Sequence, residues 1–159
     1  MPTFDFAFTV PASLNAVSAL HHNPSVLRAL TPPPLIATFQ HIEPLAEGSQ
    51  VRFTLWLGPI PIRWQARHHK VSLQGFADEQ INGPLQAWQH THTFQPLDET
   101  HTTIHEHIEY QHKPGWRGWL TRLLFSPPGL HFLFRYRAWV TRRLLARQST
   151  ENRLKSPTL

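Results

Sequence analysis

The sequence contains no cysteine among its 159 residues. This absence excludes disulfide bonds, thiolate catalysis and cysteine-ligated zinc. Glycine is also scarce, with seven residues. None of the seven forms a phosphate-binding loop, a dinucleotide-binding fingerprint or the turn that carries a serine nucleophile. The common short motifs of nucleotide-binding and nucleophilic enzymes are therefore missing.

Long apolar runs are missing as well. No stretch approaches the roughly 18 consecutive apolar residues of a membrane-spanning helix. The N-terminus lacks the basic segment and the continuous apolar segment of a secretion signal. We therefore expect a soluble cytoplasmic protein.

The composition favours a folded domain. Hydrophobic residues make up 40% of the chain and charged residues 16%, a balance typical of a packed core rather than disorder. Aromatic residues reach 11% and include six tryptophans, which suits a dense core or a pocket for flat apolar ligands. We predict one domain over residues 1–148 and a flexible, polar tail over residues 149–159.

Apolar and polar residues alternate through much of the chain, as they do in half-buried β-strands. The first alternating segment is Phe4–Val10, and the pattern returns between Leu35 and His112 with short interruptions such as Gly58-Pro59. The later strands are predicted at Ile36–Ile42, Gln50–Leu57, Ile62–Ser72, Phe76–Ile81, Leu85–Phe94 and Thr102–His112. Because the interruptions are too short for crossover helices, we predict a seven-stranded antiparallel sheet.

Helical patterns flank the sheet region. Ser13 is the predicted N-cap of a short helix through Leu20, and a second short helix is predicted over Ser25–Leu30. Ser126-Pro127-Pro128 begins a long C-terminal helix. Its predicted core-facing residues, at helical spacing, are Leu130, Leu133, Phe134, Val140, Leu144 and Leu145.

The order of these elements predicts an α+β fold with a hollow interior. The apolar face of the sheet must be covered, and the C-terminal helix is the only predicted element of sufficient length. Twist curls a sheet of this size around the helix, and one helix does not fill the resulting hollow. We therefore predict an internal cavity, roofed by the short helices and by the segment Trp116–Leu124.

Several runs of residues resemble a known group of proteins. They are Leu30-Thr31-Pro32-Pro33, Gly58-Pro59 with Arg63-Trp64, Gly75-Phe76-Ala77-Asp78-Glu79-Gln80 leading to Gly83-Pro84, Trp88-Gln89-His90-Thr91-His92-Thr93-Phe94, Tyr110, and Phe134-Arg135-Tyr136-Arg137. In these runs, and in element order over residues 3–148, the chain resembles the SRPBCC superfamily of helix-grip domains. That group includes START lipid-transfer domains, polyketide cyclases and birch-pollen allergens, and the nearer resemblance is to bacterial cyclase/dehydrase-like ligand-binding members.

The chain departs from this pattern at two places. Glu106 stands where an aspartate is expected, and Gln111-His112-Lys113-Pro114 replaces a more apolar strand end. The resemblance implies a helix-grip fold and a cavity for a hydrophobic ligand. It identifies neither the ligand nor a reaction, because the group mixes carriers, binding proteins and enzymes.

Strand alternation also sorts polar residues onto faces of the sheet. The face that carries Trp88 and Phe94 also carries His90 and His92, and the face that carries Ile104 and Ile108 also carries Glu106. Because the aromatic and aliphatic members indicate inward-facing sets, the polar members point inward too. Asp78 and Gln80 likewise share a face with Phe76, so the residues expected to converge inside the cavity are Asp78, Gln80, His90, His92 and Glu106.

Several interpretations of this polar group stay open. The residues orient the polar end of a ligand, satisfy one another in an internal network, or transfer protons, with His90, His92 and Glu106 as the catalytic candidates. A metal site formed by His90, His92 and Glu106 has less support. The same His-x-His spacing recurs at His105 and His107, in a chain with twelve histidines. We therefore predict no metal and no cofactor.

Positive charge is concentrated near the C-terminus. From Lys113 onward there are ten of the fifteen lysines and arginines and a single acid, Glu151. This distribution indicates a solvated helix face or a contact with an anionic partner. Trp116 and Trp119, with arginines beside them, form either a lid over the cavity or a weak membrane-surface contact. We do not expect a nucleic-acid partner.

The leading functional prediction is a carrier or binding protein for a small hydrophobic ligand of aromatic, isoprenoid or lipid-like type. The alternatives are a cyclase- or dehydratase-type lyase that uses His90 or His92 with Glu106, and a membrane- or partner-binding module that uses the basic C-terminal helix. The predicted ligand-contacting residues are Trp64, Asp78, Gln80, Trp88, His90, His92, Phe94, Ile104, Glu106, Ile108, Tyr110 and Phe134.

Overall fold

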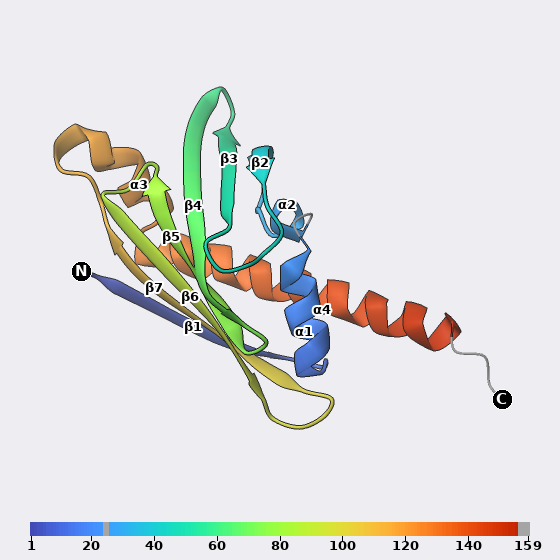
Figure 1. Cartoon of the computed structure of the whole chain (residues 1–159). Coiled ribbons are helices and arrows are strands. Elements are labelled where there is room, and N and C mark those ends of the chain that lie inside the picture. Colours follow the sequence, from blue (N-terminus) through green and yellow to red (C-terminus); the bar gives the residue numbers. More distant parts are fainter. Residues whose placement is uncertain (24–25, 156–159) are drawn as a thin grey trace.

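A computed structural model describes residues 1–23 and 26–155 of the chain, with the side chains of residues 1–23 and 26–150. The fold is built on one antiparallel sheet of seven strands in the order β1-β7-β6-β5-β4-β3-β2 (Figure 1). The strands are β1 (Thr3–Val10), β2 (Leu35–Ile42), β3 (Gln50–Leu57), β4 (Ile60–Ser72), β5 (Gly75–Asn82), β6 (Ala87–Pro96) and β7 (Thr102–Gln111). The predicted meander, with the first strand added beside the last, is confirmed.

Most strand boundaries lie within one residue of the prediction, but β4 and β6 each begin two residues away from it for local reasons. β4 begins at Ile60 because Gly58, with φ 56°, allows a tight turn and lets Leu57 pair directly with Ile60. β6 begins at Ala87 because the main chain of Leu85 is bonded elsewhere. Its N–H donates to Gln80 Oε1 at 3.3 Å and its carbonyl accepts from Gln80 Nε2 at 3.0 Å.

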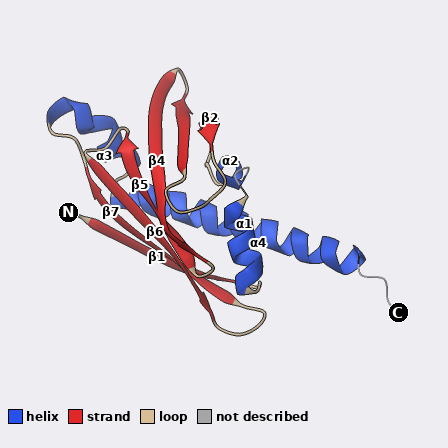
Figure 2. Ribbon diagram, in the orientation of Figure 1, coloured by secondary structure: helices blue, strands red, loops and turns tan. Residues whose placement is uncertain are grey.

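The helices follow the predicted order and gather on one side of the sheet (Figure 2). They are α1 (Leu14–His22), α2 (Val26–Ala29), the 3-10 turn η1 (Gly115–Gly118), α3 (Trp119–Leu124) and α4 (Pro127–Lys155). Ser13 caps α1 by accepting from the N–H of Ala16, and Ser126 accepts from the N–H of Gly129 at the start of α4. Ser25, the predicted start of the second helix, lies outside the described residues.

The long helix ends later than predicted. α4 continues to Lys155, so residues 149–155 extend the helix where the sequence predicted a tail. The hydroxyl groups of Ser149 and Thr150 donate to carbonyls one turn earlier, which keeps these polar residues compatible with a helix. Neither glycine nor proline interrupts the segment before Pro157.

The buried side chains form two apolar clusters, one toward each end of the sheet's inner face. One contains Trp64, Trp88, Tyr110, Leu130 and Phe134 among its members. The other contains residues of β1, α1 and α4, together with Phe94 and Ile104. On β6 and β7 the residues between the two clusters are polar: His90 and His92 on one strand and Glu106 on the other. The core is therefore divided by a polar layer, to which β5 adds Asp78. This layer is part of the site described below.

Gly75 holds β5 against β6 and so places this layer. Its φ is 140°, and a Cβ at this position would collide with the main-chain carbonyl of His92. We expect Gly75→Ala to lower the free energy of unfolding by at least about 2 kcal/mol, because strain and collision add. Gly58→Ala, where φ is 56° and the space is open, is the control and costs about 1 kcal/mol. Urea denaturation measures both, and equal losses would contradict this account.

Candidate functional site

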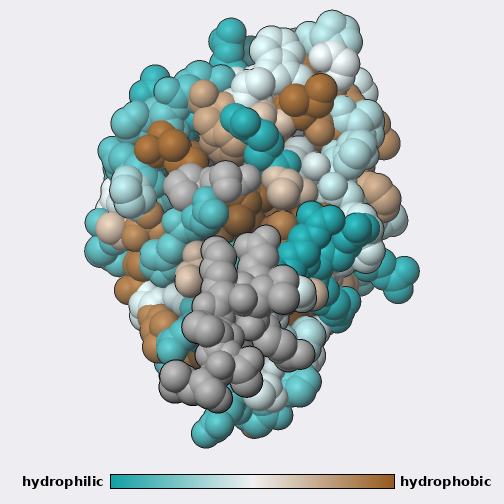
Figure 3. Space-filling view, turned by 90° about the vertical axis from the view of Figure 1, so that its right-hand side faces the viewer, coloured by the Kyte–Doolittle hydropathy of each residue, from teal (hydrophilic) through white to brown (hydrophobic). Residues whose placement is uncertain are grey.

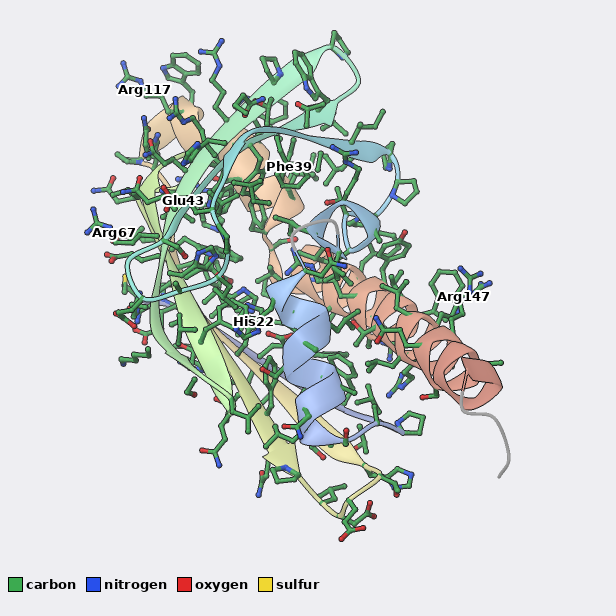
Figure 4. All side chains as sticks on the ribbon, turned by 45° about the vertical axis from the view of Figure 1, so that its right-hand side comes forward. His22, Phe39, Glu43, Arg67, Arg117 and Arg147 are labelled. Carbon is green, nitrogen blue, oxygen red and sulfur yellow. The ribbon has the colours of Figure 1, made fainter. Side chains whose placement is uncertain are left out.

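A cavity of about 480 Å³ lies between the sheet and the helices. Its wall is mainly apolar and comes from α1, α2, the segment that leads into β2, strands β3 to β6, α3 and the first half of α4. On the face shown in Figure 3, hydrophobic residues are visible in a recess near the centre, among polar neighbours. In Figure 4, His22 is labelled on the side of α1 that faces the sheet. Both α1 and the sheet line the cavity there.

The inner end of the cavity meets the polar layer, which consists of Asp78, His90, His92 and Glu106. Strand register brings the four together: Asp78 is directly opposite His90, and His92 is directly opposite Glu106. Directly opposed and diagonal residues on one face of a sheet are close enough for side-chain contact. Asp78 and both histidines line the cavity, whereas Glu106 does not.

Each imidazole in the layer contacts both carboxylates. His90 Nε2 lies 2.8 Å from Glu106 Oε2 in a buried hydrogen bond, and His90 Nδ1 lies 3.4 Å from Asp78 Oδ2. His92 Nδ1 lies 2.7 Å from Glu106 Oε2 without the alignment of a hydrogen bond, and its Nε2 lies 3.4 Å from Asp78 Oδ2. Glu106 therefore sits behind the two rings, and Asp78 sits on their cavity side.

The charges in this layer stabilise one another. Burial opposes ionisation, but the charge of Glu106 and contact with Asp78 raise the pKa of His92 to about 9. Burial raises the pKa of each carboxyl group, but contact with the two imidazoles outweighs it and holds the pKa of both Asp78 and Glu106 well below the usual range. At neutral pH the two carboxyl groups are therefore ionised and His92 is protonated.

Two further residues at this end were missed by the sequence analysis. Arg137 of α4 lines the cavity, its guanidinium lies over the ring of Phe134, and its Nε is buried with no hydrogen-bond partner among the described residues. His21 of α1 lies 4.7 Å from the Phe94 ring and 5.9 Å from the His92 ring, centroid to centroid. Burial, and then the charge of His92, lower the pKa of His21 to about 4, so its ring is neutral.

Helical spacing contained the signal for both residues. Arg137 is seven residues after Leu130 and three after Phe134, on the stripe already predicted to face the core. His21 is four residues after the buried Val17. The charge of Arg137 and the polarity of His21 argued against an inward position for either side chain. Only the position of the cavity explains why both point inward.

The twelve residues predicted to contact a ligand separate into three groups. Those that line the cavity are Trp64, Asp78, Trp88, His90 and His92. Those that are buried in the protein but do not line it are Phe94, Ile104, Glu106, Ile108, Tyr110 and Phe134. Gln80 does neither, because its amide is bonded to the main chain of Leu85 at the β5–β6 turn.

The segment expected to roof the cavity is only partly a lid. Leu124 and Phe125 line the cavity, and Phe125 packs against Trp64 and Trp88. Trp116 and Trp119 instead remain 78% and 56% exposed. The described basic side chains from Lys113 to Arg147 do not form one patch, since Arg117 and Arg147 lie near opposite ends of the molecule (Figure 4). No helix within the described part of the chain has the length and apolarity needed to cross a membrane.

The polar layer predicts a large stability effect at Glu106. Glu106→Ala leaves the imidazoles of His90 and His92 buried without their shared carboxylate, and we expect a loss of about 3–5 kcal/mol in the free energy of unfolding. Glu109→Ala, on the outer face of the same strand, is the control and changes it by less than about 0.5 kcal/mol. Chemical denaturation at neutral pH measures both. A loss at Glu106 no larger than at Glu109 would show that the layer is not a coupled unit.

Comparison with known proteins identifies the fold of this chain. No family model matches the sequence, and no curated protein matches it. Among solved structures, the Zhui aromatase/cyclase from Streptomyces sp. R1128 matches with a TM-score of 0.72 at 14% identity, over 93% of this chain and 95% of that one. A START superfamily protein from Mycobacterium smegmatis matches with a TM-score of 0.68 at 10% identity, over 92% of this chain and 98% of that one.

Norcoclaurine synthase from Thalictrum flavum, solved in complex with dopamine and hydroxybenzaldehyde, matches with a TM-score of 0.64 at 17% identity, over 92% of this chain and 87% of that one. At such identities the similarity shows the fold and not the activity. With its curved seven-stranded sheet and long C-terminal helix, this chain has a helix-grip fold, which it shares with these solved structures.

Proposed function

We propose that the protein binds a small hydrophobic molecule in its internal cavity, as a carrier or binding protein. The observation that carries this proposal is a cavity of about 480 Å³ with a largely apolar wall and a polar inner end. That volume lies within the range of about 300–1,000 Å³ that is usual for small-molecule sites. A wall of leucine, phenylalanine and tryptophan side chains favours an aromatic, isoprenoid or lipid-like compound.

The polar end supplies the orientation of the ligand. Arg137, His92 and Asp78 bring charged groups to a cavity whose wall is otherwise mainly apolar, and Arg137 Nε is left with an unused donor. Because an unpaired buried donor costs about 1–3 kcal/mol, a ligand oxygen that accepts from Arg137 would recover part of that cost. We therefore expect an amphipathic ligand with a carbonyl, hydroxyl or carboxylate group at one end.

The comparisons support this proposal at the level of the fold. One similar structure is a START superfamily protein, one is an aromatase/cyclase, and one holds the small aromatic compounds dopamine and hydroxybenzaldehyde. All three share the sheet and helix that form the cavity in this chain. Native mass spectrometry of protein purified from its own host would identify a retained compound directly.

A cavity-filling variant tests the proposal. Leu55 of β3 lines the cavity, whereas Arg52 of the same strand is exposed. We expect Leu55→Trp to raise the Kd of the apolar probe 8-anilinonaphthalene-1-sulfonate at least tenfold, because the indole occupies the probe's space. Arg52→Trp is the control and leaves the Kd unchanged. Fluorescence titration measures both, with circular dichroism to confirm folding, and equal probe binding by the two variants would refute cavity binding.

A weak contact with an anionic membrane surface is a second candidate function. It is favoured by the exposure of Trp116, Trp119 and Leu123, at 78%, 56% and 63%, beside the cationic Arg117. Leu123 also lines the cavity, so this surface adjoins the cavity wall. Arg122 braces the segment by donating to the carbonyls of Lys113 and Gly115. Aromatic and arginine side chains together are typical of membrane interfaces.

Vesicle binding tests the membrane contact. The double variant Trp116→Ala/Trp119→Ala is expected to lower the fraction that sediments with phosphatidylcholine vesicles containing phosphatidylglycerol by at least threefold, because it removes the interfacial rings. Trp139→Ala is the control, since that ring is 51% exposed but lies on α4. If the double variant sediments as the native protein does, this second function is wrong.

A further inference from the structure

We propose that Asp78, His90 and His92 bind a divalent first-row transition-metal ion at the inner end of the cavity. This inference goes beyond ligand binding and does not depend on it. The donors are two imidazole nitrogens and one carboxylate oxygen, a set that such ions accept readily and that leaves further coordination positions open. The three donor atoms all lie within 4.8 Å of one another.

The spacing of the donors fits an ion better than it fits hydrogen bonds. Asp78 Oδ2 lies 3.4 Å from His90 Nδ1 and 3.4 Å from His92 Nε2. A hydrogen bond between such atoms would bring them to about 2.9 Å. Ligands at about 2.1 Å from a tetrahedral ion are separated from each other by roughly 3.4 Å. The carboxylate thus stands at the distance that a shared ion would impose on both rings.

Glu106 occupies the position of an outer carboxylate. It contacts His90 Nε2 at 2.8 Å and His92 Nδ1 at 2.7 Å, the ring nitrogens opposite the two proposed donor atoms. A carboxylate hydrogen-bonded behind a metal-binding imidazole orients the ring and leaves the other nitrogen free for the metal, and His90 has this arrangement. The sequence analysis had considered Glu106 as the third ligand, and the fold instead supplies Asp78 for that role and places Glu106 behind the rings.

The local charge balance permits a cation. With neutral imidazoles, Asp78 and Glu106 contribute two negative charges and Arg137 one positive charge, which leaves an excess of negative charge in a buried region. A bound divalent ion would compensate this excess. An ion has the further advantage of contacting both rings and Asp78 at once. Its open positions would face the cavity, which Asp78, His90 and His92 all line.

The test uses the purified protein after treatment with a chelator and dialysis. We expect it to bind one equivalent of Zn²⁺ in calorimetric titration and to give Co²⁺ the intense visible absorption of a low-symmetry nitrogen–oxygen site. Asp78→Asn, His90→Gln and His92→Gln should each weaken Zn²⁺ binding at least 100-fold. Glu106→Gln, which keeps the shape of the outer residue, should weaken it about 10–100-fold without changing the stoichiometry.

The chain contains a matched control for adventitious binding by histidine. His105 and His107 have the same His-x-His spacing, but they lie on the opposite face of β7, away from Glu106. The double variant His105→Gln/His107→Gln should bind Zn²⁺ as the native protein does. Loss of binding in this control, unchanged binding in Asp78→Asn, or no saturable one-to-one binding by the native protein would each overturn the proposal.

A measurement on the native protein removes any dependence on whether the variants fold. In nitrogen-15 NMR spectra of the histidine side chains, Zn²⁺ should shift His90 Nδ1 and His92 Nε2 to metal-bound values. If Zn²⁺ instead shifts only exposed histidines such as His105, the proposal is wrong.

Probe binding measured with and without Zn²⁺ keeps the two proposals apart. Probe binding that survives in metal-free protein while Zn²⁺ fails to bind refutes the metal site alone, and Zn²⁺ binding without probe binding refutes the cavity function alone.

Discussion

The rest of this structure depends on the contact between two imidazoles and two carboxylates in the middle of the sheet. His90 and His92 project from β6, Asp78 from β5 and Glu106 from β7, so the layer ties three adjacent strands together on their inner face. Removing these charges from water is costly, and only their mutual attraction compensates the cost. The three strands must therefore keep their register, because a shift of one residue would turn every one of these side chains to the other face.

The same layer explains why the interior is not a single apolar core. Phe134, Trp64 and Trp88 pack on one side of it, and Phe94, Ile104 and Leu145 pack on the other. Where the sheet curves away from the helices, the space between them stays open as the cavity, with the layer at its inner end. An apolar chamber that ends on buried charge can hold an amphipathic molecule, and a site of this kind suits either orientation of a ligand or coordination of an ion.

Much of this arrangement was predictable from local patterns. Alternation along 88–94 and 102–110 identified the inner faces, and it correctly placed His90, His92 and Glu106 among apolar neighbours. Pairing between neighbouring hairpins then determines which of these residues meet. Gln80 shows the limit of such reasoning, because alternation assigns it to the inner face while the turn after β5 draws its amide to the main chain of Leu85. Trp116 and Trp119 show another limit, since their helical spacing does not reveal that no element covers them within the described chain.

By itself, the sequence determined the α+β class, the antiparallel meander, the long final helix and the set of polar residues on the inner faces, because these follow from side-chain periodicity and turn chemistry within short segments. Only the tertiary structure decided which polar residues face the cavity and which stand behind others. Whether Arg137 and His21 come to lie at the same end depends on how α4 and α1 cross the sheet. Whether Asp78 or Glu106 faces the open space depends on the curvature of three strands. Both are properties of packing between distant segments, which no local pattern records.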